Sequence, residues 1–592
     1  MKKPIVILGV VLLFIPLARL NAEELSQPKY TVIEELDVKV PMRDGIRLST
    51  NIYRPDAKVK IPALLLRTPY RHAAVNIPNI KDARYLAERG YVAIIQDTRG
   101  RFKSEGLFSP YFFEAEDGLD TQKWVSEQPW CNGEIGTWGS SYQGGTQWIP
   151  ALKGSPYVDA MFTTVPVTDH YTVLFQNGAL SMRLFVSWCT SMTIPYDFKL
   201  GEFQKHDIEE VNRFLPLIEQ DTKIGWRIPY FRDWVNHPED DAYWAPLRFE
   251  GKYSNVHSAV YIVAGWYDLL TMQNLKSFME MTKPAIAPAV RSRQKIIIGP
   301  WGHVTWDSSK LGDMDFGKEA VLDTQELMLR WFDATLKGID TGILKEPPVK
   351  IFVMGENVWR FENEWPLKRT VYTKYYLHGG GNANTKDGDG TLSVDLPRDE
   401  QLDRFVYDPD NPVPSMPDSS VFDGYYYNPI DHSRLEGRPD ILVYSTPTLD
   451  RDMEVTGPLD IILYAASSAV NTDFTGKLLD VYPDGRAIYI RDGIIRASFR
   501  NGPKNTSNIQ PGEVYEYRID LWATSNVFKK GHRIRVEISS SNFPRFDRNL
   551  NTGGNFATET KWVKAEQTIY HSKEYPSCIV LPVIPLKSNM GK

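Results

Sequence analysis

The sequence has few cysteines and no strong excess of charge of either sign. Its only cysteines are Cys131, Cys189 and Cys578, too few to hold a chain of 592 residues together by disulfides. Their spacing matches no zinc-binding pattern. The formal net charge of -6 at pH 7 gives no basic face for nucleic acid. We therefore expect free, buried thiols, no metal site, no other cofactor and no nucleic-acid partner.

Long apolar runs are also missing, apart from one near the start of the chain. Lys2 and Lys3 precede an apolar run from Ile5 to Leu17, which is shorter than the ~20 residues that span a bilayer. The stretch Leu20-Asn21-Ala22 follows and could serve as the cleavage site. This pattern is typical of a cleavable signal peptide, so residues 1–22 are predicted to be removed. The mature protein is expected to be periplasmic or secreted, without a stable membrane anchor.

Between residues 23 and 367, short apolar runs alternate with helical patterns. The apolar runs have the length of buried strands, and residues Lys81–Arg89, Glu114–Glu127 and Asp323–Leu336 have helical spacing. This alternation is typical of an α/β domain with a mostly parallel sheet that helices cover on both faces. The predicted strands are Ala63–Arg67, Val92–Gln96, Ile135–Trp138, Met161–Val165, Val260–Ala264 and Lys295–Gly299.

Two regions depart from this alternation. Residues 169–251 contain helical patterns such as Lys205–Gln220 and no clear strand. They predict a helical cap that is inserted between residues 23–168 and 252–367 of the α/β domain. Residues 368–592 carry short alternating strands and turn-rich loops, which predict an all-β domain, most simply a sandwich or jelly roll.

The stretch GTWGSSYQGG, residues 136–145, lies between a predicted strand and a helical pattern. A strand-to-helix turn of this kind is where many serine hydrolases hold their nucleophile. The usual Gly-x-Ser-x-Gly frame does not fit, because two serines stand side by side. The sequence must therefore show which serine the turn would present.

The residue two positions before the nucleophile decides between the two serines. It must be small, because strand and helix approach each other closely there. Gly139 stands at this offset from Ser141, whereas Trp138 stands at this offset from Ser140 and would clash. Ser141 is therefore the predicted nucleophile, although Gln143 occupies a position where a generic turn would have a second small residue.

An acid and a base follow at the ends of two later strands. A serine hydroxyl needs an imidazole to take its proton and a carboxylate to hold that imidazole in the correct tautomer. Asp268 follows the predicted strand Val260–Ala264, and His303 follows Lys295–Gly299. His303 is the only histidine that directly follows a predicted strand of the α/β domain. Ser141, Asp268 and His303 are therefore predicted to form a catalytic triad.

These residues belong to longer stretches that resemble one family. Together they resemble the CocE/NonD hydrolases, which are cocaine-esterase-like enzymes related to X-Pro dipeptidyl peptidases and α-amino acid ester hydrolases. The resemblance covers nearly the whole mature chain and implies an α/β-hydrolase domain with an inserted helical cap, plus a C-terminal jelly-roll domain. The stretches are RTPY (Arg67–Tyr70), QDTRGRFKSEG (Gln96–Gly106), GSSYQG (Gly139–Gly144), GWYD (Gly265–Asp268), GPWGH (Gly299–His303), DFTGKLLDVYPDGRAIY (Asp473–Tyr489), and LWATSNVF through SSSNFPRFDRNLNTG (Leu521–Gly553).

The resemblance also implies an oxyanion hole and limits the substrate. The backbone N–H of Tyr142 and the hydroxyl of Tyr70 match the two donors that would hold the oxyanion. Relatives that act on α-amino acyl groups carry extra carboxylates after the acid of the triad and in the early cap. Residues Leu269–Met272 and Tyr171–Met182 contain no such acid, so amino-acid ester hydrolysis and X-Pro dipeptidyl peptidase action are disfavoured.

We therefore expect an exported serine hydrolase that cleaves small carboxylic esters or amides through an acyl-Ser141 intermediate, without a cofactor. Phe175, Trp188 and Trp266 are the candidate residues of its substrate pocket. Two alternatives remain open at this point. One is an acylase acting on side-chain amides such as glutaryl-cephalosporins, and the other is an exported glycan-binding protein. The strand edges of the β domain could also support a homo-oligomer.

Overall fold

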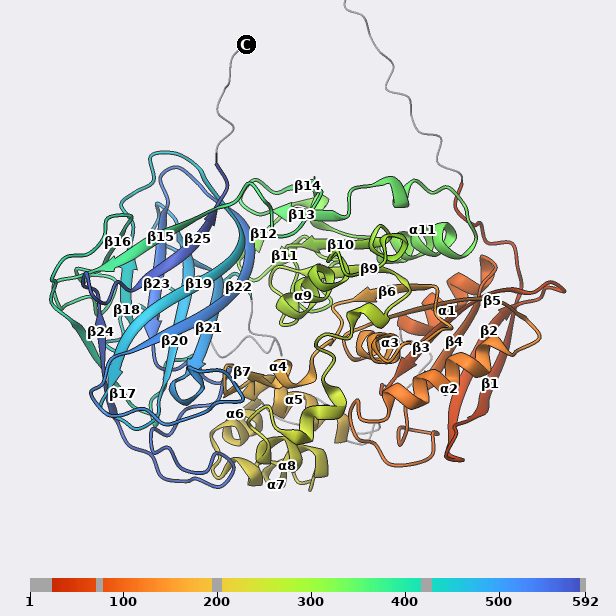
Figure 1. Cartoon of the computed structure of the whole chain (residues 1–592), viewed down its shortest axis with the longest axis horizontal. Coiled ribbons are helices and arrows are strands. Elements are labelled where there is room, and N and C mark those ends of the chain that lie inside the picture. The colour runs from red at the N-terminus through yellow and green to blue at the C-terminus, as the bar shows by residue number, and fades with distance from the viewer. Residues whose placement is uncertain (1–23, 71–77, 194–204, 417–427, 586–592) are drawn as a thin grey trace, which may run out of the picture.

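The computed structural model describes residues 24–70, 78–193, 205–416 and 428–585. The predicted signal peptide lies outside these residues. Figure 1 shows an α/β part beside a β-rich part, with a group of helices below both. In the chain, the helical group lies between two segments of the α/β part, and the β-rich part follows them.

Some properties follow directly from the described residues. Cys131, Cys189 and Cys578 are buried free thiols, as predicted. Within the described ranges, no helix is both long enough and apolar enough to cross a membrane. In the same ranges, no group of three or more His, Cys, Asp or Glu side chains is placed to hold a metal ion.

A ten-stranded sheet forms the centre of the α/β part, in the order β1-β2-β4-β3-β5-β6-β9-β10-β13-β14. Neighbouring strands from β4 to β13 are parallel, and antiparallel strands close both edges. The mostly parallel sheet is therefore confirmed. Its strands are β1 (Val32–Pro41), β2 (Arg47–Pro55), β3 (Ile61–Thr68), β4 (Val92–Asp97), β5 (Cys131–Ser140), β6 (Ala160–Thr164), β9 (Ala259–Gly265), β10 (Gln294–Gly299), β13 (Val349–Val353) and β14 (Val358–Glu362).

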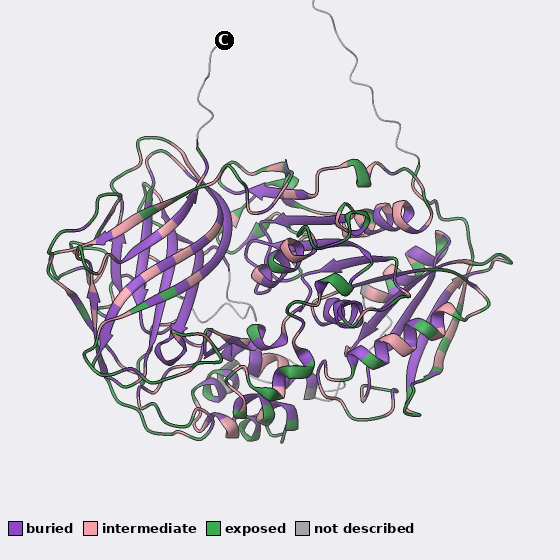
Figure 2. Cartoon of the chain, viewed as in Figure 1, coloured by how far each residue is buried: buried purple, intermediate pink, exposed green. Residues whose placement is uncertain are grey.

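Helices cover both faces of this sheet because successive side chains of a strand point to opposite faces. Leu64 and Leu66 of β3 pack in one core with α1 and α11, and Ala63 and Leu65 pack in another with α2, α3 and α9. Figure 2 shows the strands from β2 to β13 in the sheet order as mostly buried, whereas the edge strands β1 and β14 are largely exposed or intermediate. The helices are α1 (Pro78–Glu88), α2 (Glu114–Ser126), α3 (Tyr142–Leu152), α9 (Thr271–Met281), α10 (Pro288–Arg291) and α11 (Thr324–Leu336).

The helical group lies between β6 and β9 in the chain. It differs from the prediction over Lys205–Gln220, where α6 ends at Arg213 and a short 3-10 turn begins at Leu217. Pro216 explains the break, because a proline disfavours the helical conformation of the residue before it and lacks a backbone N–H. The elements are α4 (His170–Leu174), a small hairpin of β7 (Phe175–Gln176) and β8 (Ala179–Leu180), α5 (Met182–Thr193), α6 (Lys205–Arg213), α7 (Gln220–Lys223) and α8 (Pro229–Asn236).

The C-terminal part is β-rich and is built on an eleven-stranded sheet. Pairing is antiparallel except between β16 and β18. The all-β prediction is confirmed, and the jelly-roll assignment stays a prediction. The strands are β15 (Val371–His378), β16 (Thr391–Ser393), β17 (Asp403–Tyr407), β18 (Leu442–Ser445), β19 (Met453–Ser467), β20 (Asp473–Val481), β21 (Ala487–Arg496), β22 (Tyr515–Phe528), β23 (Arg533–Ser539), β24 (Ala565–Tyr570) and β25 (Cys578–Val583).

Candidate active site

The predicted nucleophile Ser141 forms the turn between β5 and α3. Its backbone has φ 57° and ψ -118°. Residues other than glycine rarely adopt this conformation, because it is strained. The Ser141 N–H donates a hydrogen bond of 3.0 Å to the carbonyl of Thr164, the last residue of β6. This is the geometry of a nucleophile elbow, which exposes the serine hydroxyl at the carboxyl edge of the sheet.

Gly139 and Gln143 explain why this elbow departs from the usual sequence frame. Gly139 has φ 135°, and a Cβ atom placed on it would lie 2.6 Å from the Cβ atom of Gln143. The amide of Gln143 accepts a hydrogen bond of 3.1 Å from the Ser140 N–H and donates one of 3.1 Å to the Thr68 hydroxyl. Gln143 therefore ties the elbow to the end of β3, and its side chain occupies the position where the usual frame has a second glycine. The next residue, Gly144, is the one without room for a side chain, because a Cβ atom placed on it would lie 2.7 Å from Pro166.

Asp268 and His303 meet at the same edge of the sheet. Asp268 lies after β9 and His303 lies after β10, and these strands are parallel neighbours. Nδ1 of His303 lies 2.6 Å from Oδ2 of Asp268, and the Leu270 N–H donates a hydrogen bond of 2.6 Å to the other carboxylate oxygen. Both side chains are buried. A carboxylate held in this way fixes the tautomer of the imidazole and leaves Nε2 facing outward.

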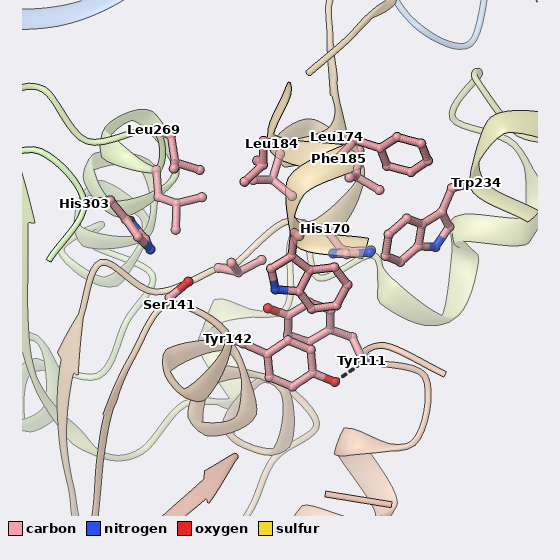
Figure 3. A pocket seen from close by; sticks show the side chains of 14 residues that line it. Tyr111, Ser141, Tyr142, His170, Leu174, Leu184, Phe185, Trp234, Leu269 and His303 are labelled. Carbon is pink, nitrogen blue, oxygen red and sulfur yellow. Dashed lines mark hydrogen bonds between the residues drawn. The ribbon is translucent and has the colours of Figure 1, made fainter. Parts of the chain in front are cut away.

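Ser141 and His303 line one cavity of about 50 Å³ under the helical group. Figure 3 shows the Ser141 hydroxyl and the His303 ring pointing toward one another on one side of this cavity. The structure thus brings together the three residues of the predicted triad, which lie far apart in the sequence. The arrangement can transfer a proton from Ser141 to His303 while Asp268 stabilises the charged ring.

Tyr70, the predicted donor to the oxyanion, stands two residues after β3. The Trp188 Nε1–H donates a hydrogen bond of 3.2 Å to its hydroxyl oxygen. Burial raises the pKa of Tyr70, against smaller lowering effects from hydrogen bonds with Trp188 and Ser141 and from the charge of Arg101. The Tyr70 hydroxyl therefore lies beside Ser141 and keeps its proton at neutral pH, as a donor must.

Tyr142 is the first residue of α3, and hydrogen bonds of its hydroxyl hold its side chain in place. Its hydroxyl donates to Glu114 at 3.0 Å and accepts from the Tyr111 N–H at 3.0 Å. Glu114 in turn forms an ion pair of 2.6 Å with Arg67. The first N–H groups of a helix have no partner within that helix. The Tyr142 N–H therefore lies in the first turn of α3, directly after Ser141, where the sequence predicts a donor to the oxyanion.

Of the three candidate pocket residues, only Trp188 lies in the wall of this cavity. Phe175 is buried against Tyr171, Trp244 and Phe556 instead. Trp266 is buried against Trp365, and its Nε1–H donates a hydrogen bond of 2.8 Å to the Phe352 carbonyl. Both rings complete an internal core, which is the commoner place for large aromatic side chains.

Several wall residues were not predicted from the sequence. The cavity is lined mainly by apolar and aromatic side chains of the helical group, with His170 among them. His170 follows β6 by a few residues, and this position after the carboxyl end of a strand could have identified it as a candidate site residue. The wall residues in helices gave no signal, because their spacing matches any buried helix, and those in loops, such as Tyr111 and Leu269, belong to no motif. The full set is Tyr111, Ser141, Tyr142, Val167, His170, Val173, Leu174, Leu184, Phe185, Trp188, Trp234, Leu269, Leu270 and His303.

The β-rich part also reaches the site. Nη1 of Arg491, on β21, donates a hydrogen bond of 2.6 Å to the carbonyl of Trp266, two residues before Asp268. Backbone bonds then join this loop to the His303 loop, with the Tyr267 N–H donating to the Trp301 carbonyl at 2.9 Å. The C-terminal part thus braces the loop that carries the acid.

Comparisons with known proteins agree with this architecture. Residues 44–305 match the X-Pro dipeptidyl-peptidase (S15) family, and residues 341–580 match the X-Pro dipeptidyl-peptidase C-terminal non-catalytic domain. The chain is 39% identical to the cocaine esterase of Rhodococcus sp. (strain MB1 Bresler), over 93% of this chain and 98% of that protein. The fold and these matches define a serine ester hydrolase with an α/β-hydrolase domain.

Solved structures share the whole fold. An aminopeptidase from a marine sediment archaeon, Thaumarchaeota archaeon, superposes with a TM-score of 0.80 over 94% of this chain and 97% of its own, at 24% identity. A CocE/NonD family hydrolase from Staphylococcus aureus superposes with a TM-score of 0.68 over 94% of each chain, at 18% identity. With the cocaine-esterase match over nearly its full length, the chain belongs to the CocE/NonD hydrolase family.

Proposed function

We propose that this protein hydrolyses small carboxylic esters through an acyl-Ser141 intermediate. The observation that carries the proposal is the buried 2.6 Å contact between Asp268 and His303, beside a serine in a strained elbow in the same cavity. Each of these features has a cost in stability or strain. A nucleophilic attack by Ser141 on a substrate accounts for both features at once.

The reaction follows from the roles of the side chains. His303 takes the proton of Ser141 as its oxygen bonds to the ester carbonyl carbon, and the carbonyl oxygen becomes an oxyanion held by the Tyr142 N–H and the Tyr70 hydroxyl. His303 then gives this proton to the leaving alcohol as the C–O bond breaks. Water then attacks the acyl carbon, again with His303 as base. The bond to the Ser141 oxygen breaks as His303 gives the proton to that oxygen, which releases the carboxylic acid and restores Ser141.

The cavity favours a neutral acyl group. Among the described residues that line it, none is Lys, Arg, Asp or Glu. Asp169, which precedes the wall residue His170, caps α4: its carboxylate accepts a hydrogen bond of 3.2 Å from the Thr172 N–H. A cavity without a carboxylate would not compensate the lost hydration of an ammonium group. This supports ester hydrolysis over dipeptidyl peptidase or amino-acid ester activity.

A fluorophosphonate probe with mass spectrometry tests the proposal. The wild type should be labelled on Ser141 and should hydrolyse p-nitrophenyl esters. Ser141→Ala should lose labelling and about 10³-fold or more of the turnover. Ser140→Ala is the matched control and should keep both. Labelling on another residue, or full turnover by Ser141→Ala, would refute the assignment of the nucleophile.

We also propose that the protein is exported and cleaved after Ala22. Lys2, Lys3 and the apolar run from Ile5 to Leu17 support this proposal. Expression of the full chain, cell fractionation and N-terminal sequencing test it. A protein found only in the cytoplasm with its first residues intact would contradict export without affecting the ester hydrolase proposal.

A further inference from the structure

One buried polar side chain in the cavity plays no part in the proposed reaction. His170 is the first residue of α4 and is only 7% exposed. Neither of its ring nitrogens has a hydrogen-bond partner in the part of the chain that the structure describes. Leaving a buried donor or acceptor unpaired costs about 1–3 kcal/mol, so nearly all such groups in folded proteins have a partner.

Aromatic rings surround His170. Its ring centroid lies 4.7 Å from that of Tyr111, 4.8 Å from that of Trp234 and 5.9 Å from that of Trp244. Burial alone lowers the pKa of His170 to about 3. The ring is therefore neutral at physiological pH, with one nitrogen that donates and one that accepts.

His170 belongs to the same cavity as the predicted triad. Figure 3 shows Ser141 and His303 on one side of the cavity, and His170 with Trp234 on the other. Apolar side chains such as Leu174, Leu184 and Phe185 complete the wall. An acyl group attached to Ser141 would extend along these apolar side chains toward the histidine.

We propose that His170 is a specificity-determining residue that binds a hydroxyl group on an aromatic acyl group of the substrate. The proposal rests on the proposed ester hydrolysis, because that reaction places the acyl carbonyl at Ser141. The geometry that carries it is an unpartnered, buried imidazole at one side of an aromatic cavity that has the nucleophile at the other.

The chemistry of the cavity selects a hydroxyl over other groups. A hydroxyl donates and accepts, as the neutral imidazole does, so either nitrogen of His170 can bind it. A carboxylate would need a positive charge, but no cationic residue lines the cavity within the described ranges. The aromatic side chains of the wall, among them Trp188 and Trp234, suit contact with an aromatic ring of the substrate between the reacting carbonyl and the hydroxyl.

Kinetics on matched esters test the proposal. The substrates are p-nitrophenyl benzoate and its 3-hydroxy, 4-hydroxy and 4-carboxy derivatives, and the measured quantity is the ratio of kcat/KM for each derivative to that for benzoate. Comparing this ratio between the wild type and His170→Phe cancels the intrinsic reactivity of each ester. We expect one hydroxy ester to have a ratio about tenfold or more higher in the wild type than in His170→Phe. His170→Gln, which keeps a donor and an acceptor, should retain part of the preference.

A binding experiment makes the result independent of turnover. In the Ser141→Ala background, quenching of tryptophan fluorescence gives the affinity for methyl benzoate and for the methyl 3- and 4-hydroxybenzoates. At least one hydroxybenzoate should bind more tightly than benzoate, and His170→Phe in the same background should remove the difference. If esters bind with this preference but the wild type does not hydrolyse them, the proposed function fails and the role of His170 stands.

Three results would overturn the proposal. They are equal affinity of the Ser141→Ala protein for hydroxybenzoates and benzoate, an unchanged hydroxyl preference in His170→Phe, and a preference for the 4-carboxy ester. Melting curves show whether His170→Phe is folded. If His170→Phe is unfolded, the affinities of the Ser141→Ala protein and the kcat/KM ratios of His170→Gln still test the proposal.

Discussion

The Nε1–H of Trp188 donates a hydrogen bond to the hydroxyl oxygen of Tyr70, over 3.2 Å. Trp188 comes from α5 of the helical group, and Tyr70 comes from the loop after β3, so the bond joins the group to the sheet at the reacting centre. Because a lone pair of the Tyr70 oxygen is occupied by this donor, the hydroxyl proton can turn toward Ser141. The helical group therefore helps to orient the proposed oxyanion donor as well as forming a wall.

Tyr70→Phe should lower kcat for p-nitrophenyl esters by about 10²–10³-fold with little change in KM, because the lost donor acts mainly on the transition state. Steady-state kinetics measure this split. Trp188→Phe removes the N–H that orients Tyr70 together with part of the cavity wall but keeps the Tyr70 hydroxyl, and a smaller loss of kcat is expected. If Tyr70→Phe stays within about threefold of the wild type, Tyr70 is not the oxyanion donor.

Asp268→Asn should lower kcat by about 10⁴-fold while the protein stays folded, because an amide in this position favours the wrong tautomer of His303. Kinetics with a thermal melt check both parts. Asp169→Asn is the matched control, since its amide oxygen can still accept the Thr172 N–H that caps α4. The acid is misassigned if Asp169→Asn proves as damaging as Asp268→Asn.

Gly139→Ala should reduce both stability and activity. Its new Cβ atom would lie 2.6 Å from the Cβ of Gln143, and φ is 135°, so we expect a cost of about 1–3 kcal/mol or more. Gly133→Ala is the control, because it is on the same strand with φ 101° and no atom within 4 Å of the new Cβ. Chemical denaturation and ester kinetics of both variants separate the clash from backbone strain. Equal effects of the two changes would exclude the clash.

The core of the fold could be predicted because its signals are local. The strands of the parallel sheet are continuous apolar runs, and β9 and β10 end within one residue of the predicted ends. Ser141, Asp268 and His303 were predicted from the same signals, because each follows such a strand and parallel strands end at one edge. The prediction of a continuous helix over Lys205–Gln220 was wrong, because Pro216 interrupts the helical pattern.

The pocket could not be predicted in the same way. Phe175 and Trp188 are both aromatic residues of the same helical group, but only Trp188 faces the cavity. Which buried ring faces a cavity and which fills a core depends on packing between distant segments, for example that of Phe175 against Phe556. Likewise, the bond from Arg491 to Trp266 depends on how two parts of the chain meet.

His170 should make the protein sensitive to acid. Its pKa in the folded state is about 3, below the value of about 6.5 expected when the chain is unfolded. Between these values the unfolded chain binds one more proton than the folded protein at this site, so the free energy of unfolding falls as pH decreases. The contribution is fully present above pH ~6.5 and is lost toward pH ~3, by about 1.4 kcal/mol per pH unit.

Denaturant titrations at pH 7 and pH 4.5 measure this effect in the wild type and in His170→Gln, which cannot take up a proton. The free energy of unfolding of His170→Gln should fall less than that of the wild type, by roughly 2–3 kcal/mol over this range. His257→Gln, at an exposed histidine, should follow the wild type more closely. If His170→Gln and the wild type lose stability in parallel, the pKa of His170 is the same in the folded and the unfolded state, and burial does not keep the ring neutral at pH 4.5.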